Sequence, residues 1–78
     1  MNRQVRQHQV LVLDWLKDQR EAQGLTMRDL AARLEVPHSF VGKVEQRERR
    51  LDVVEFVIYC EALGVKPADG LKVIARSR

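Results

Sequence analysis

Pro37 divides a stretch of helix-forming sequence into two short segments. Proline disfavours helical backbone angles in the residue before it, so a helix that precedes Pro37 should end by Glu35. At the start of this segment, the hydroxyl of Thr26 can accept a hydrogen bond from the amide of Asp29, whose carboxylate can reach back to the Thr26 amide. We therefore predict two short helices between Thr26 and Glu45, the second of them beginning at Pro37.

Apolar periodicity, capping residues and glycines predict three further helices, at about residues 5–23, 53–63 and 66–74. The first should end at Gly24 and the last but one at Gly64, because glycine readily adopts the left-handed conformation of a helix C-cap. Asp52 and Glu55 repeat the capping pattern ahead of residues 53–63. Residues 75–78 are expected to form a frayed tail.

The length and composition restrict the fold further. Seventy-eight residues allow a single domain, spanning 1–78, and 45% hydrophobic with 32% charged residues is typical of a folded globular chain. No alternating strand pattern of useful length is present, so we predict an all-α bundle of five helices. The apolar run Val10–Leu13 is too short for a signal core or a membrane span, and Cys60 is the only cysteine. A soluble, cytoplasmic chain without disulfides is expected.

The reactive side chains form no recognisable site for chemistry. No nucleophile, base and acid stand together and no glycine-rich phosphate loop is present, so we predict that the protein is not an enzyme. His8 and His38 are thirty residues apart and are not accompanied by a cysteine pair, so neither a metal site nor another cofactor is expected. Cys60 falls on the same helical stripe as Phe56 and Leu63, which predicts a core thiol.

Positive charge is concentrated after the predicted helix pair, although the formal net charge is only +3. Within eight positions lie four basic residues against two acidic ones: Lys43, Arg47, Arg49 and Arg50, with Glu45 and Glu48. A local basic patch is the electrostatic feature expected of a nucleic-acid-binding protein. A solvated charged loop would have the same composition, so the patch alone leaves both interpretations open.

Two short helices joined by a tight turn inside a small helical bundle have the geometry of a helix-turn-helix, here at about residues 26–45. Ala31 is small enough to let the two helices approach closely, and Val36 is an aliphatic residue that can hold the turn in place. The second helix of such a motif projects from the domain and fits a major groove about 12 Å wide. The arrangement predicts binding to double-stranded DNA.

Several short motifs keep their register along the chain: Gly24-Leu25-Thr26, Leu30-Ala31, Val36, Val41, Glu45 and Ala62-Leu63-Gly64-Val65. Together they resemble the phage repressor and Cro type of helix-turn-helix protein, also called the XRE family, over about residues 12–74. The resemblance implies a five-helix repressor-like bundle. It also implies a sequence-specific transcriptional regulator, most often a repressor, that binds a near-palindromic operator as a dimer.

The resemblance also implies roles for individual residues. The recognition helix, residues 37–45, would contact base edges through four positions: His38, Ser39, Gly42 and Lys43. Phosphates would be held by the amides near two residues and by the loop that follows the recognition helix: Met27 and Arg28, with Gln46, Arg47, Arg49 and Arg50. Arg20 and Glu45 match positions where the family often has an internal ion pair that joins the first helix to the third.

Four positions depart from the family pattern. Met27 stands where the family commonly has Gln, which removes one side-chain contact to phosphate, although the helix N-terminus keeps its amides. Glu35 and Arg47 stand where Gly is frequent, so we expect positive φ or an altered turn at both. His38 replaces a frequent Gln, so the preferred DNA sequence cannot be copied from relatives.

The helix predicted at 53–63 is apolar nearly all round. One stripe can face the core: Val53, Phe56, Cys60 and Leu63. Val54 and Ile58 form a second stripe, and two apolar faces in so small a domain indicate a second buried surface. We expect a homodimer that uses this stripe and the last helix: Val54, Ile58, Leu71 and Ile74.

Two other functions remain open from the sequence. One is a restriction-modification controller or an antitoxin, in which the same fold also serves a specific genetic partner; co-purification of a second protein would favour the antitoxin. The other is a protein-interaction module that has lost DNA binding, which the departures at Met27, Glu35 and Arg47 would allow. Because fold does not determine function, the sequence leaves open the operator, repression or activation, the target genes, any effector, any protein partner and the exact dimer interface.

Overall fold

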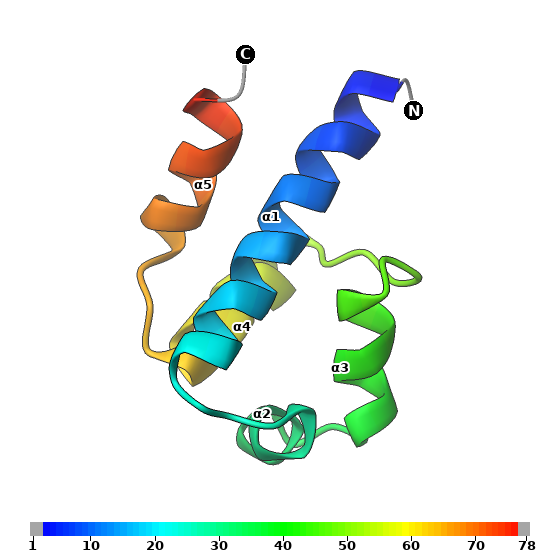
Figure 1. Ribbon diagram of the computed structural model, residues 1–78, viewed down its shortest axis with the longest axis vertical. Helices are drawn as coiled ribbons and strands as arrows, with labels where there is room; N and C mark the ends of the chain where they lie inside the picture. The colour runs from blue at the N-terminus through cyan, green and yellow to red at the C-terminus, as the bar shows by residue number, and fades with distance from the viewer. Residues whose placement is uncertain (1–2, 77–78) are drawn as a thin grey trace.

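The computed structural model describes residues 3–76, which form five helices and no strand (Figure 1). The helices are α1 Arg3–Ala22, α2 Met27–Leu34, α3 His38–Glu45, α4 Val53–Leu63 and α5 Pro67–Arg76. The predicted all-α class is confirmed, with the third helix beginning one residue after Pro37. Within the described residues, no helix is both long and apolar enough to cross a membrane.

Side-chain caps begin α2 and α4 where the capping pattern predicts them. The Asp29 amide donates to Thr26 Oγ1 at 3.0 Å, and the Thr26 amide donates to Asp29 Oδ2 at 2.9 Å. Asp52 and Glu55 form the same reciprocal pair at 2.8 and 3.0 Å. Both capping boxes are therefore confirmed, and each satisfies two amides that the helix itself leaves without partners.

The chain reverses direction at residues with positive φ. Gly24 and Gly64 end α1 and α4 with φ of 69° and 70°, a conformation without steric cost for glycine. Glu35 and Arg47 have φ of 58° and 67°, so the positive φ expected at these two positions is confirmed. In the left-handed region a residue with a Cβ is disfavoured by about 1–2 kcal/mol.

Glu35→Gly is expected to stabilise the fold by about 0.5–1 kcal/mol, because relief of the left-handed strain exceeds the entropy that glycine adds to the unfolded chain. The Glu35 side chain is exposed, and glycine would keep the hydrogen bond that the backbone amide of residue 35 donates to the Ala32 carbonyl. Urea unfolding measures the change. Glu61→Gly, at an exposed position inside α4, is the matched control and should destabilise by about 1 kcal/mol. A loss of stability in both variants would contradict the assignment of strain to Glu35.

The core lies where α1, α2, α3 and α4 meet. Its least accessible side chains are Leu16, Leu30, Val41, Val44, Tyr59, Cys60 and Leu63. The prediction of a core thiol at Cys60 is confirmed, and burial raises its pKa to about 11. The prediction that Val53 faces the core is wrong, because its side chain is 74% exposed. Val53 lies in the first turn of α4, beside a surface groove, and Tyr59 completes the buried stripe.

The longest helix, α1, lies beside α5 along the upper part of the molecule (Figure 1). Gly70 is buried at this contact, and a Cβ built on it would lie 2.8 Å from the ring of Trp15 and 2.9 Å from that of Phe56. Val73 and Ile74 are half-buried, so packing extends into the last turn of α5. The expected frayed tail is therefore wrong for residues 75 and 76, which are helical, while 77–78 lie outside the described residues.

Candidate nucleic-acid interface

The helix pair α2 and α3 is held from beneath by small and aliphatic side chains. Leu30, Ala31 and Val41 are at most 2% exposed, and Val36 is half-buried in the turn between the helices. Glu35 ends α2 in the left-handed conformation, and its amide donates to the carbonyls of the last turn. Figure 1 shows that α3 then runs along the edge of the bundle, on the side away from α5. One face of α3 is therefore open to a ligand.

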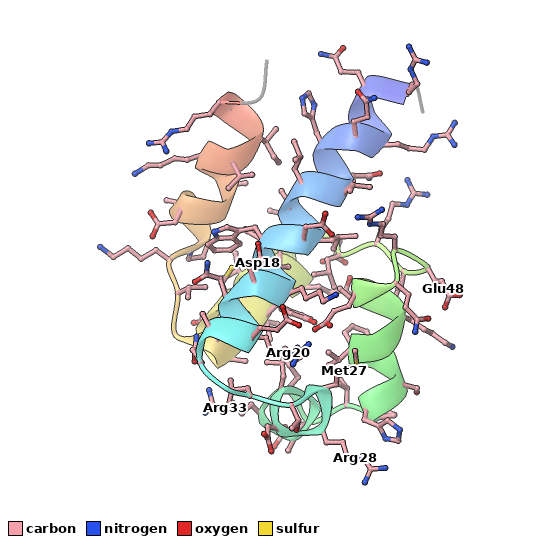
Figure 2. All side chains as sticks on the ribbon, viewed as in Figure 1. Asp18, Arg20, Met27, Arg28, Arg33 and Glu48 are labelled. Carbon is pink, nitrogen blue, oxygen red and sulfur yellow. The ribbon has the colours of Figure 1, made fainter. Side chains whose placement is uncertain are left out.

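Three of the four residues predicted to contact bases lie exposed on this open face: His38, Ser39 and Lys43. The fourth, Gly42, is half-buried, and a Cβ on it would lie 3.9 Å from the sulfur of Met27. Met27 thus packs towards α3 instead of extending into solvent (Figure 2). The structure places the predicted base-contacting residues together, with Gly42 next to α2 and less accessible than the others.

The N-terminus of α2 lies beside this face. The amides of Met27 and Arg28 precede the first hydrogen bonds inside the helix, so they can donate to an anion. The Arg28 side chain is exposed and points away from the core (Figure 2). Within residues 3–76, the side chains of Arg28, Lys43 and Arg50 form no ion pair, so their charges are available to an external partner.

Arg47 and Arg49, also predicted to contact phosphate, both have acidic partners. Arg47 Nη2 donates to the two carboxylate oxygens of Asp14 on α1, at 3.1 and 2.9 Å. This pair is about half exposed, and exposed pairs contribute little to stability, so Arg47 can exchange Asp14 for a phosphate. Arg49 instead forms a two-bond contact with Glu55 on α4.

Neither acidic partner can be predicted from the sequence. Asp14 is 33 residues from Arg47, on a different helix, and no pattern in the sequence indicates that they meet. The sequence around Glu55 predicts only its place in a capping box, because its contact with Arg49 depends on the path of the irregular loop between α3 and α4.

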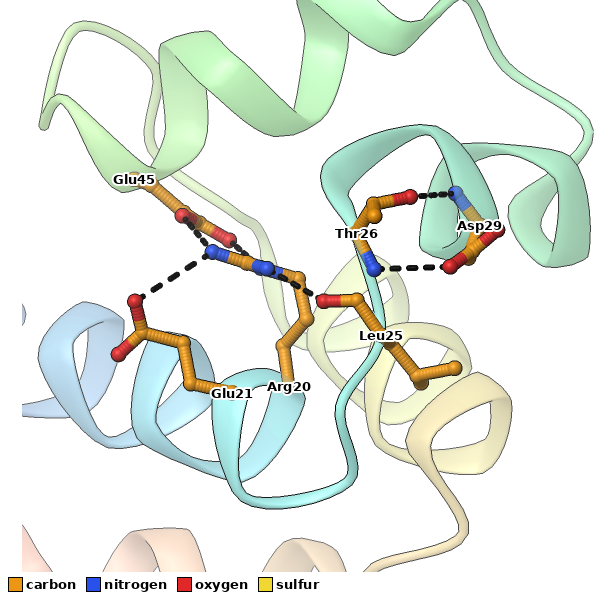
Figure 3. A network of polar contacts seen from close by, with 6 residues as sticks. All are labelled: Arg20, Glu21, Leu25, Thr26, Asp29 and Glu45. Atoms are coloured by element: carbon orange, nitrogen blue, oxygen red, sulfur yellow. Dashed lines mark hydrogen bonds and ion pairs between the residues drawn. The ribbon is translucent and has the colours of Figure 1, made fainter.

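A buried ion pair fixes the far end of α3. Arg20 donates from Nε and Nη2 to the Glu45 carboxylate at 2.6 and 3.0 Å, and from Nη1 to the Leu25 carbonyl at 2.5 Å (Figure 3). The side chains of Arg20 and Glu45 are only 9% and 3% exposed. The hydrogen bond to Glu45 raises the pKa of Arg20. The ion pair implied by the resemblance is present, and it joins α1 to the C-terminal end of α3.

Apolar side chains are exposed on α4 and α5. Val54, Ile58 and Leu71 are 62%, 49% and 53% exposed, and Ile74 is half-buried. Leu71 and Ile74 on α5 line a groove of about 370 Å³ between α1, α4 and α5, and Val53 on α4 lines it as well. Val54 and Ile58 lie outside this groove, on the outer face of α4. The residues predicted for the dimer interface therefore belong to two surface regions.

Comparison with known proteins agrees with this geometry. A helix-turn-helix family profile matches residues 16–69. The structure is similar to that of an XRE-family like protein from Pseudomonas syringae pv. tomato str. DC3000, with a TM-score of 0.84 and 44% sequence identity over 91% of this chain and 88% of that one. No curated protein sequence matches the chain significantly. The chain belongs to the XRE family of helix-turn-helix proteins, and it is a DNA-binding transcription regulator, not an enzyme.

Proposed function

We propose that the protein represses transcription by binding a near-palindromic operator as a homodimer, with α3 of each copy in the major groove. The observation that carries this proposal is the exposed face of α3, where His38, Ser39 and Lys43 project from a helix whose opposite side is buried. Side chains at the N-terminal end of a recognition helix reach base edges in this type of motif. Bound to an operator, the dimer would exclude other proteins from the same DNA.

Phosphate contacts would come from both sides of α3. On the α2 side, the amides of Met27 and Arg28 and the Arg28 guanidinium face outward. On the loop side, Gln46, Arg47 and Arg50 are exposed. Contacts of this kind set the position and affinity of the protein on DNA, whereas base contacts set its sequence preference. Arg49 is left out of this set because its guanidinium is engaged within the chain.

Selection of bound duplexes from a random DNA pool, at near-physiological salt, tests the proposal directly. We expect enrichment of a two-fold symmetric site whose half-sites are one helical turn, about 34 Å, apart. Recovery of no preferred sequence, with only salt-sensitive bulk binding, would instead support a protein-interaction module.

Ile58→Glu is expected to weaken the homodimer at least about 30-fold, because a charge on an apolar anchor residue costs about 2 kcal/mol or more. Its half-exposed position on the outer face of α4 allows the variant to fold as a monomer. Sedimentation equilibrium measures the association. Ala22→Glu, which adds the same charge at the exposed end of α1, should leave it unchanged. A dimer of undiminished stability in Ile58→Glu would exclude this interface.

A further inference from the structure

We propose that Arg49 is a positioning residue that ties the recognition helix α3 to the first turn of α4 and does not contact phosphate. This inference rests on the proposed function, since it concerns how α3 is held against DNA. It assigns to Arg49 a role different from the one that the resemblance implies.

The Arg49 side chain is engaged on three sides. Nη1 and Nη2 donate to Glu55 Oε1 and Oε2 at 3.1 and 2.7 Å, and Nη1 also donates to the Arg50 carbonyl at 2.7 Å. The guanidinium carbon lies 4.5 Å from the centre of the Phe40 ring, within the range of a cation–π interaction. Two-bond contacts between arginine and carboxylate are strong and directional, so they fix the plane of the guanidinium.

The acidic end of this contact is itself held in place. Glu55 Oε1 also accepts from the Asp52 amide at 3.0 Å, so one carboxylate both caps α4 and binds Arg49. The hydrogen bonds from Arg49, and to a smaller extent the one from the Asp52 amide, lower the pKa of Glu55 to about 2. Glu55 is therefore ionised at neutral pH, and Arg49 has a fixed negative partner.

Phe40 is the third residue of α3 and follows His38 and Ser39, two of the exposed residues proposed to contact bases. Arg49 holds Phe40 near the start of α3, while the Arg20–Glu45 pair holds the last residue of the helix. Contacts at both ends of α3 restrict its rotation about its own axis. Because small errors in orientation weaken base contacts, the tie through Arg49 should affect sequence discrimination more than total affinity.

A phosphate contact would require Arg49 to leave Glu55, and the two roles predict opposite effects of Glu55→Gln. This substitution preserves the capping box, in which Gln can replace Glu, but it removes the charge that holds Arg49. If Arg49 positions α3, the variant should lose affinity for the selected operator. If Arg49 binds phosphate, the same variant should bind every duplex more tightly, because Arg49 is released and a negative charge is removed.

The test measures fluorescence anisotropy of labelled operator and of a scrambled duplex over a range of salt concentrations. We expect Glu55→Gln and Arg49→Gln to reduce the ratio of operator to scrambled affinity about tenfold, the scale of coupling between contacting residues. Arg50→Gln removes the same positive charge from the next, exposed position and is the matched control for Arg49→Gln. Arg50→Gln should reduce the steepness of the plot of log affinity against log salt concentration by about 0.9, the value for one lost phosphate contact. Arg49→Gln should leave this slope unchanged.

Thermal unfolding first establishes that each variant is folded. Phe40→Leu removes the ring but keeps an apolar side chain, and it should reduce discrimination in the same way, with no further loss when it is combined with Arg49→Gln. A wild-type chain without preference for any duplex would overturn the proposed function and this role together. A selective wild type whose selectivity survives Glu55→Gln and Arg49→Gln would overturn the positioning role alone.

Discussion

Arg20→Met is expected to destabilise the fold by about 3–5 kcal/mol, the cost of leaving a buried charge without its partner. Glu45 is 3% exposed and accepts two hydrogen bonds from Arg20, and the Leu25 carbonyl loses its donor as well. Urea unfolding followed by the fluorescence of Trp15, the only tryptophan, measures the loss. No other single side-chain pair in residues 3–76 combines such deep burial with two opposite charges.

The paired variant Arg20→Met with Glu45→Leu separates loss of the partner from loss of the pair. Removing both charges should recover most of the stability, because two apolar groups can replace a buried ion pair at little cost. Arg28→Met, at an exposed position of α2, is the control for the change in charge and should alter stability by less than about 0.5 kcal/mol. A cost below about 1 kcal/mol for Arg20→Met would show that Glu45 finds water or another partner.

Gly70→Val is expected to destabilise the fold by about 3 kcal/mol, because new atoms would overlap two aromatic rings in a packed contact. A Cβ alone would lie 2.8 Å from Trp15 and 2.9 Å from Phe56, and both rings belong to the packed interior. The separation of α1 and α5 would have to increase to admit the side chain. Thermal or urea unfolding measures the effect, and near-ultraviolet circular dichroism reports the environment of Trp15.

Lys72→Val, two residues further along the same helix and exposed, is the matched control for Gly70→Val. It measures the lower helix propensity of a β-branched residue, which costs less than about 0.7 kcal/mol. Gly70→Ala should fall between the two, because its gain in helix propensity offsets part of the overlap. Wild-type stability of Gly70→Val would mean that the contact between α1 and α5 is looser than the structure shows.

Local signals in the sequence were sufficient to predict most helix boundaries. Thr26 with Asp29, Asp52 with Glu55, and Gly64 act within a few residues of themselves, so their effect can be worked out without knowing the fold. The prediction of which α4 side chains face the core was less reliable. Val53 has the right spacing from Phe56, but it belongs to the first turn, where the helix leaves the core. Periodicity specifies a direction around the helix and does not specify where along it the packing ends.

For the candidate interface too, only those features that depend on nearby residues can be predicted from the sequence. The exposure of His38 and Lys43 follows from the buried spacing of Val41 and Val44 on one short helix. The engagement of Arg49 does not follow, because it depends on how an irregular loop returns the chain to α4. The charge pattern indicates a basic patch, but it does not separate arginines without an acidic partner in residues 3–76, such as Arg50, from Arg49, which forms an ion pair with Glu55.

The side chains on the open face of α3 make no contribution to the core, and this separation affects how such a regulator can evolve. His38, Ser39 and Lys43 can each be replaced without creating a cavity or leaving a buried group unpaired. Under the proposed function, a change in the operator can thus be matched by a change in the protein that alters stability by less than about 0.5 kcal/mol. Duplicated copies of the gene could therefore diverge towards separate operators within one cell, while the scaffold that folds and presents α3 stays the same.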